Sequence, residues 1–334
     1  MQEEYFRLYC STVEAIKRVD SRLRVGGPAT SNFEKGKAPW VEEFLAYCAS
    51  NDIPVDFVST HPYPNNWPMD SAGQQLMTCR YENSTYDDTR WLRDTIGRSA
   101  FPDAEIHLTE WNSSPSPRDL VHDTAFMAPF IIQNNLRCIG LTDSLVFWTF
   151  TDVFEENRVG DIMFHGGFRL INLQDLPKAS FYGYWFLSKL GEERIITGEN
   201  YVVTRNDDRI QILMWNYCHY NGRFAHGDRS GLTEYNRYSV FEDKGSIDFD
   251  VTVTGFVGNY KITEYMFDRG HGSAFDAWVD LGAPPDPTEG ELEFIRRKTG
   301  PEYKIAFLEG QETFRKVVTV QPHGVSLIEL QKLY

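Results

Sequence analysis

The 334-residue sequence has few cysteines, no long hydrophobic run and a deficit of basic residues. Its five cysteines, at positions 10, 48, 79, 138 and 218, show no CxxC spacing, and an odd number cannot form a complete set of disulfides. We therefore expect reduced thiols, which favours a cytoplasmic protein. No apolar stretch approaches the roughly 20 residues of a membrane-spanning helix, and the acidic first residues predict no signal peptide. Cytoplasmic localisation and no membrane partner are the expectations.

The charge balance narrows the range of partners. The chain has 33 Lys and Arg against 48 Asp and Glu, which gives a net charge of -15 and a pI of about 5.0. Such a surface repels nucleic acid and anionic membranes and favours a neutral ligand. Hydrophobic residues make up 41% and aromatic residues 14%, so we expect a folded protein with room for two domains.

The first 192 residues alternate between apolar strand-like runs and amphipathic helical stretches. A helix is expected at residues 3–20, and four strand–helix units follow it, with a long helix at 119–136 in the third. The strands of these units are predicted at 23–28, 54–59, 107–113 and 143–150. This alternation predicts a parallel sheet covered by helices, hence an α/β fold for residues 1–192.

The pattern changes near residue 193. Short runs with a period of two follow one another, and polar turn clusters such as 206–208 separate them. This pattern is typical of an antiparallel β-sandwich. We therefore predict a second, all-β domain over residues 193–334, with a short helix at 289–298.

Residues 107–113, His-Leu-Thr-Glu-Trp-Asn-Ser, form the stretch with the clearest chemistry. A Ser-Pro-Ser-Pro loop at 114–117 follows the predicted strand and leaves Glu110 near its end. Enzymes with a (β/α)₈ barrel keep catalytic groups at the C-terminal ends of strands, and a carboxylate there can attack an anomeric carbon. Taken alone, the heptapeptide fits an ordinary strand-end glutamate in a salt bridge better than it fits a nucleophile.

Four segments together resemble glycoside hydrolase family 39, the β-xylosidases. They are residues 23–29, 54–63, 107–114 and 147–156, and shorter matches lie at 121–124 and 164–168. The resemblance implies a (β/α)₈ TIM barrel followed by an antiparallel β-sandwich. It also implies retaining hydrolysis of a xylose-containing oligosaccharide or xyloside, without a cofactor.

The resemblance assigns roles to five residues. The nucleophile falls on Glu110, and substrate-binding positions fall on His61, Tyr63, Trp148 and Glu156. Structural hydrogen bonding remains the alternative for His61 and Tyr63, core packing for Trp148, and a solvated charge cluster for Glu156.

Three further polar residues are compatible with a metal site by their spacing. His122, Asp123 and His165 could supply ligands. They fall on family motifs that hold no metal, so we favour a structural role and expect no metal.

One departure from the family matters more than the matches. A Trp-Asn-Glu-Pro-type segment supplies the family's general acid/base, and these 334 residues contain none. The chain therefore resembles the family without the N-terminal half of its barrel, with strands five to eight retained. Because retaining hydrolysis needs two carboxyl groups about 5–5.5 Å apart, we expect weak or no activity from the chain alone. Asp152, Glu155 and Glu156 are candidates for a replacement acid.

A half-barrel also raises a folding problem. Four strands cannot close a barrel, so strands five and eight become open edges and an apolar inner face is uncovered. We therefore expect a homo-oligomer formed through the open half-barrel, or a separate fragment that supplies the first four strands. A non-catalytic sugar-binding relic and one half of a split enzyme remain the alternatives to an active hydrolase.

Overall fold

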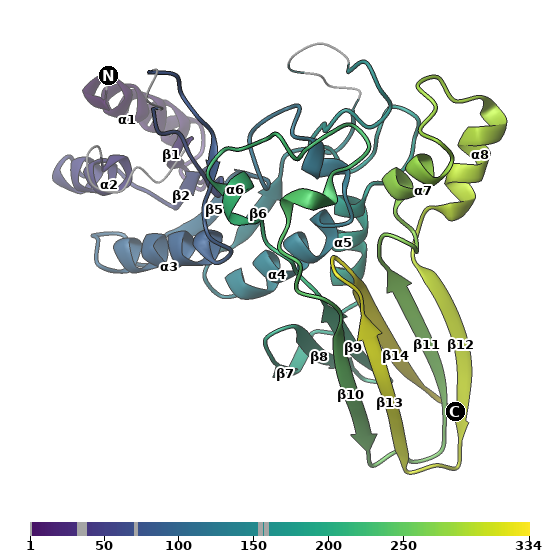
Figure 1. Cartoon of the computed structure of the whole chain (residues 1–334). Coiled ribbons are helices and arrows are strands. Elements are labelled where there is room, and N and C mark those ends of the chain that lie inside the picture. The colour runs from purple at the N-terminus through teal and green to yellow at the C-terminus, as the bar shows by residue number, and fades with distance from the viewer. Residues whose placement is uncertain (1, 32–38, 70–72, 153–155, 157–159) are drawn as a thin grey trace. The chain divides into compact units, whose positions relative to one another are not determined.

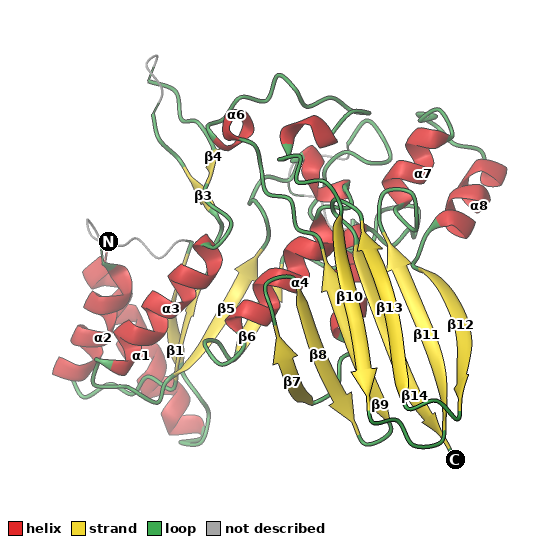
Figure 2. Ribbon diagram, turned by 60° about the horizontal axis from the view of Figure 1, so that its bottom comes forward, coloured by secondary structure: helices red, strands yellow, loops and turns green. Residues whose placement is uncertain are grey.

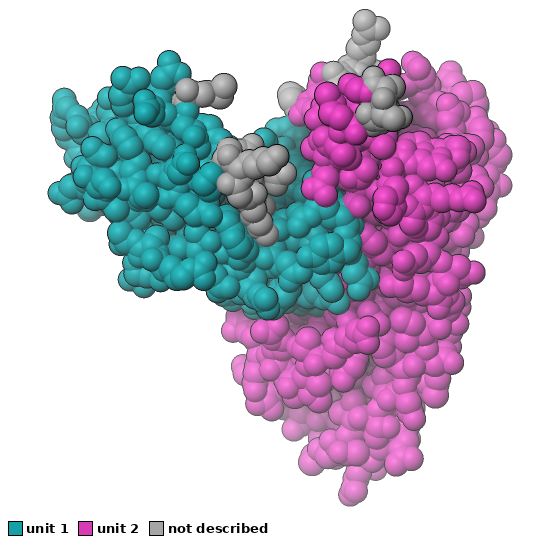
Figure 3. Space-filling model, turned by 60° about the vertical axis from the view of Figure 1, so that its left-hand side comes forward, with its two compact units in different colours: residues 1–65, 80–115, 134–148 teal, residues 66–79, 116–133, 149–334 magenta. Residues whose placement is uncertain are grey.

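The computed structural model of the chain describes residues 2–31, 39–69, 73–152, 156 and 160–334 (Figures 1 and 2). The chain divides into two compact units, coloured separately in Figure 3. Unit 1 comprises residues 1–65, 80–115 and 134–148, and unit 2 comprises residues 66–79, 116–133 and 149–334. The domain boundary after residue 192 stays a prediction.

The elements follow the order shown in Figures 1 and 2. The helices are α1 (Gln2–Val19), α2 (Trp40–Ser50), α3 (Ser84–Gly97), η1 (Leu120–Asp123), α4 (Met127–Cys138), α5 (Ala179–Leu187), α6 (Gly222–Ala225), η2 (Tyr238–Val240), α7 (Ala274–Asp280) and α8 (Glu289–Lys298). The strands are β1 (Gly26–Thr30), β2 (Phe57–Thr60), β3 (Asn65–Asn66), β4 (Thr78–Cys79), β5 (Glu105–Trp111), β6 (Ser144–Phe147), β7 (Glu193–Thr197), β8 (Tyr201–Asn206), β9 (Arg209–Trp215), β10 (Ile247–Thr254), β11 (Asn259–Phe267), β12 (Glu302–Glu309), β13 (Thr313–Val320) and β14 (Val325–Leu333). Within the described residues, no helix combines the length and apolarity needed to cross a bilayer.

Unit 1 is built on a four-stranded parallel sheet in the order β1-β2-β5-β6. The register places Val58 opposite both Gly27 and Ile106. The parallel sheet predicted from the alternating pattern is confirmed. In the sheet order of the described strands, β1 and β6 are the edges.

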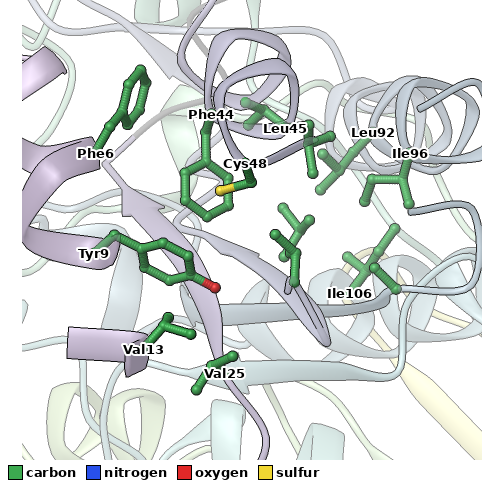
Figure 4. Packing of buried hydrophobic residues seen from close by; sticks show 14 of the residues in the cluster. Phe6, Tyr9, Val13, Val25, Phe44, Leu45, Cys48, Leu92, Ile96 and Ile106 are labelled. Atoms are coloured by element: carbon green, nitrogen blue, oxygen red, sulfur yellow. The ribbon is translucent and has the colours of Figure 1, made fainter. Parts of the chain in front are cut away.

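Helices α1, α2 and α3 pack on one face of this sheet through a single hydrophobic cluster (Figure 4). The cluster combines alternate strand residues with helical residues three or four positions apart, because these are the spacings that share one face. Its fully buried members include Phe44, Cys48, Val58, Leu92, Ile96, Ile106 and Leu108.

The opposite face of the sheet carries polar side chains, since residues 105 and 107 alternate with core residues on β5. Arg24 Nη1 lies 2.6 Å from Glu105 Oε1, and Glu105 Oε2 lies 2.9 Å from His107 Nε2. His107 Nδ1 lies 2.8 Å from Ser144 Oγ on β6. Hydrogen bonds from Arg24 and His107 lower the pKa of Glu105. The expectation of an apolar inner face is therefore wrong for this part of the sheet.

The long helix expected at 119–136 is instead two helices, η1 and α4. Thr124 between them is extended, and its hydroxyl donates 2.6 Å to the carbonyl of Val121. A threonine hydroxyl that bonds to nearby backbone competes with helix continuation. Asp119 precedes η1 and makes no side-chain capping bond there.

Unit 2 contains a six-stranded sheet in the order β12-β11-β14-β9-β8-β7 and a two-stranded sheet of β10 and β13. All pairings in both sheets are antiparallel. One hydrophobic cluster contains residues of both sheets, as in a sandwich. Its members include Ile212, Met214, Val251, Ile262, Val318, Ile328 and Leu330. The antiparallel prediction is confirmed, whereas β7, β12 and α7 were not predicted.

A buried histidine in unit 2 couples stability to pH. The His323 side chain is 3% exposed and packs against Phe241, with ring centroids 4.6 Å apart. Burial, followed by the charge of Arg269, lowers the pKa of His323 from 6.5 to about 3. Between these values the unfolded chain binds more protons than the folded chain, so the free energy of unfolding falls as the pH falls below 6.5.

Replacing His323 with Asn should therefore flatten this pH dependence. The backbone φ of His323 is 61°, which Asn tolerates. The unfolding free energy should fall from pH 7 to pH 5 in both proteins, and we expect this fall to be about 2 kcal/mol smaller in His323→Asn than in the wild type. Urea denaturation at both pH values measures it, with the exposed His226 changed to Asn as control. Equal pH dependence in wild type and His323→Asn would contradict the assignment.

Candidate active site

Glu110 lies at the C-terminal end of β5, where the pairing with β6 is irregular. Leu108 pairs with Leu145, and the next pair is Trp111 with Phe147. Three residues on β5 therefore span the same distance as two on β6, which places one extra residue at positions 109–110. Such bulges bend a strand and re-aim a side chain, often beside active sites.

Two polar side chains from the segment after β2 meet the Glu110 carboxylate. The Tyr63 hydroxyl donates a 2.5 Å hydrogen bond to Oε1, and His61 Nδ1 lies 3.4 Å from Oε2. Tyr63 is buried, while the Glu110 side chain keeps 23% of its surface exposed. Among the residues described, no Lys or Arg pairs with this carboxylate. His61 would form an ion pair with Glu110 when protonated, so both the nucleophile and the salt-bridge alternative stay predictions.

The backbone at the ends of β1 and β2 holds His61. The carbonyl of Thr30 accepts bonds from the His61 N–H at 2.8 Å and from the Thr60 hydroxyl at 3.0 Å. Ala29 just before it has a φ of 54°, and the register of the two strands shifts between Pro28 and Thr30. An alanine in this left-handed region is strained by about 1–2 kcal/mol, and such strain is concentrated at functional sites.

Trp148 follows β6 directly and is partly exposed. Its N–H donates 2.9 Å to the carbonyl of Trp111, and its carbonyl accepts a 2.7 Å bond from Asn112 Nδ2. The structure thus brings Glu110, His61 and Tyr63 into contact and ties the Trp148 backbone to the two residues after Glu110. Sequence reasoning did not foresee the Tyr63–Glu110 bond or a role for Asn112.

Residues 1–311 match the sequence profile of glycosyl hydrolases family 39. The chain belongs to this family. The β-xylosidase of Geobacillus stearothermophilus is 33% identical over 298 residues, which cover 88% of this chain and 55% of that protein. The β-xylosidase of Caldicellulosiruptor saccharolyticus is 39% identical over 194 residues, which cover 58% of this chain and 38% of that protein.

A solved structure gives the corresponding comparison of folds. A monomeric β-xylosidase from Caulobacter crescentus superimposes with a TM-score of 0.85 at 30% identity, covering 100% of this chain and 66% of that one. The family resemblance drawn from four sequence segments is therefore confirmed. The family 39 chain spans about half the length of its curated relatives.

Glu156 and the candidate replacement acids lie in a less completely described region. Glu156 is an exposed residue of unit 2, and its role as a sugar ligand stays a prediction. Glu155 falls outside the described residues. Asp152 is buried 3.6 Å from Arg169, and burial raises the pKa of Asp152. A raised pKa suits a proton donor, but the Asp152 side chain is 1% exposed and a substrate would have to reach it; its role as a replacement acid stays a prediction.

A hollow of about 720 Å³ in unit 2 is a separate feature from the predicted site. It lies among residues of β7, β8, β9 and β10 and is lined mainly by apolar side chains. None of the predicted site residues lines it, and it lacks the converging polar groups that orient a sugar.

Asp123, one of the three residues first considered for a metal, forms part of a buried ion cluster, whereas His165 Nδ1 lies 3.2 Å from the Ile162 carbonyl. Asp123 pairs with Lys178 through Oδ1, and its Oδ2 lies 2.8 Å from Arg237 and accepts the N–H of Gly166 at 2.7 Å. Burial alone would raise the pKa of Asp123, but Lys178 and Arg237 lower it to about 2. His122 Nδ1 lies 3.0 Å from the Gly166 carbonyl. Within the described ranges, no three metal-ligating side chains converge.

Removing the lysine from this cluster should be costly. Lys178→Met leaves the Asp123 carboxylate buried with one cation fewer, so we expect a loss of about 3–5 kcal/mol in unfolding free energy. Urea denaturation followed by circular dichroism measures the loss. Lys244→Met, which removes an exposed pair with Glu242, should cost about 1 kcal/mol or less. A destabilisation by EDTA in the wild type would speak for a metal instead.

Proposed function

We propose that this chain carries the nucleophile and part of the sugar site of a retaining β-xylosidase. The observation that carries the proposal is the Glu110 carboxylate at a strand end, bonded by Tyr63, facing His61 and partly open to solvent. Family membership and the β-xylosidase relatives support the substrate class. His61, Tyr63, Trp148 and Glu156 are the proposed sugar contacts.

The proposed chemistry has two steps. A carboxylate oxygen of Glu110 forms a bond to the anomeric carbon while the bond from that carbon to the leaving oxygen breaks. The leaving oxygen departs as an anion. Water then attacks the same carbon, gives up one proton to the solvent and displaces the Glu110 carboxylate, so the two inversions leave the configuration of the sugar unchanged. The Tyr63 hydroxyl bonds to Oε1 and restricts the orientation of the carboxylate. This restriction lowers the entropy cost of bringing the carboxylate into a reactive geometry.

The fold supports a matching structural proposal. We assign β1, β2, β5 and β6 to strands five to eight of a (β/α)₈ barrel within residues 1–192, with a β-sandwich over residues 193–334. The parallel order of these strands and the position of Glu110 at a C-terminal strand end agree with that assignment. The two-thirds coverage of the Caulobacter enzyme is consistent with it.

The missing partner carboxylate limits the expected rate. The 334 residues contain no Trp-Asn-Glu-Pro-type segment, so nothing with the family's motif protonates the leaving oxygen. General acid/base assistance is worth about 10²–10⁴-fold, and a poor leaving group depends on it most. We therefore propose impaired hydrolysis of xylo-oligosaccharides by these residues alone.

The leaving group should decide whether activity is seen. We expect slow release of nitrophenolate from an aryl β-xyloside, because this anion leaves without a proton, and no detectable hydrolysis of xylobiose. Glu110→Gln should abolish the aryl xyloside activity. Glu105→Gln, a matched change at the other end of β5, should retain it. Efficient xylobiose hydrolysis would overturn the proposed loss of acid catalysis, and an active Glu110→Gln variant would overturn the nucleophile.

Two outcomes of the same assays favour the alternatives. Xylose binding without Glu110-dependent turnover would indicate a sugar-binding relic. Activity restored by adding a polypeptide with the family's first four strands would indicate one half of a split enzyme. The incomplete coverage of the relatives is the observation that favours this second candidate.

The open edges of the parallel sheet should affect association. β1 and β6 end the order of the described strands, and exposed Val146 lies on β6. Unpaired strand edges invite pairing with another chain. We expect a homo-oligomer, measured as the mass by light scattering after size exclusion. A monodisperse monomer across about a hundredfold range of concentration would contradict it.

A further inference from the structure

We propose that Asn112 is a positioning residue that holds Trp148 at a fixed place beside the nucleophile strand, so that the indole can stack on the sugar. The inference rests on the proposed function, because it gives Trp148 a sugar to bind. It adds a residue to which neither the sequence motifs nor the family comparison assigned a role.

The Trp148 peptide is held from both sides by residues that follow Glu110. Its N–H donates to the Trp111 carbonyl at 2.9 Å, as a continuation of the β5–β6 pairing. Its carbonyl accepts from Asn112 Nδ2 at 2.7 Å. The second bond comes from a side chain, and the backbone N–H of the next residue, Ser113, bonds instead to Asn112 Oδ1.

The orientation of the Asn112 amide is fixed at both ends. Its Oδ1 accepts the N–H of Ser113 at 2.7 Å, and its Nδ2 donates to Trp148. Asn112 is fully buried, as are Ser113 and Ser114 after it. Displacing the Trp148 backbone breaks the bond from Asn112 Nδ2, and the loss of one such hydrogen bond costs about 1 kcal/mol. The amide therefore links the end of β5 to the residue after β6.

The consequence for a sugar differs from that of losing the nucleophile. Stacking of an indole on a pyranose ring contributes to binding, whereas bond formation depends on Glu110. Displacing Trp148 should therefore weaken binding and raise KM while kcat for an activated xyloside changes little. A residue with only a structural role would lower the folded fraction and leave KM unchanged.

We call the hydrogen bond from Asn112 Nδ2 to the Trp148 carbonyl the clamp. The isosteric change Asn112→Asp tests it. At pH 7 the carboxylate cannot donate to the Trp148 carbonyl, but it still accepts from Ser113. Burial raises the pKa of a carboxyl group, so at pH 5 the protonated side chain can donate again. Asn216→Asp is the matched control, since Asn216 is also fully buried and its Nδ2 donates to the carbonyls of Gly245 and Val320.

The readouts are KM and kcat on an aryl β-xyloside and xylose affinity by calorimetry, each as a ratio to wild type at the same pH. For Asn112→Asp we expect binding about tenfold weaker at pH 7, largely recovered at pH 5, with kcat nearly unchanged. Asn216→Asp should match the wild-type affinity at both pH values. Wild-type affinity in folded Asn112→Asp at pH 7, or an equal loss in Asn216→Asp, would overturn the clamp.

A spectroscopic arm separates this inference from the proposed function. If the wild type neither binds xylose nor cleaves the xyloside, the proposed function fails, and the fluorescence of Trp148 still reports on the clamp. That fluorescence is the difference between each protein and its Trp148→Phe counterpart. We expect a red shift and stronger acrylamide quenching in Asn112→Asp at pH 7, reversed at pH 5. An unchanged difference spectrum would overturn the clamp. Should Asn112→Asp fail to fold, Asn112→Ala is measured in the same way, without the pH recovery.

Discussion

The pairing of β5 with its two neighbours is the constraint on which the rest of unit 1 depends. β5 is an inner strand, in register with β2 from Glu105 to Leu108 and with β6 at His107 and Leu108. This regular part places Ile106 and Leu108 in the core under the helices. The pairing becomes irregular only beyond Leu108. Residues before this point pack in the core, whereas the Glu110 side chain after it is partly exposed. Regular hydrogen bonding at one end of the strand thus permits an unusual geometry at the other.

The same division between regular and irregular backbone occurs at β1 and β2. The register is regular up to Pro28 and then shifts at Ala29, whose left-handed conformation brings the Thr30 carbonyl to His61. Both irregularities lie at C-terminal strand ends, where a parallel sheet gathers its functional groups. The strain at Ala29 is tolerated because the strands behind it are held by buried contacts. Substitutions in that core should therefore affect stability before they affect the arrangement around Glu110.

The sequence predicted the features that follow from local periodicity. Runs such as 54–59 and the helical spacing in 3–20 predicted the parallel sheet and its helices, and four segments taken together identified the family. Features that depend on partners distant in the chain were missed. The Arg24–Glu105 pair on the polar face, for example, depends on strand register. The break at Thr124 was missed for another reason: its hydroxyl bonds only three residues back, and the sequence does not say which partner a threonine hydroxyl takes. Asn112 gave no signal, because its partner is 36 residues away and is a backbone carbonyl.

The contacts of Glu110 bear on what the proposed sugar site would still need. Tyr63 and His61 both belong to unit 1, and so do Asn112 and Trp148. The Glu110 carboxylate is thus contacted by side chains of the same unit. Under the proposed mechanism, a complementing polypeptide would need to supply a proton donor and the remaining wall of the sugar site. It would not need to rebuild the nucleophile, because the groups that orient Glu110 are already in place.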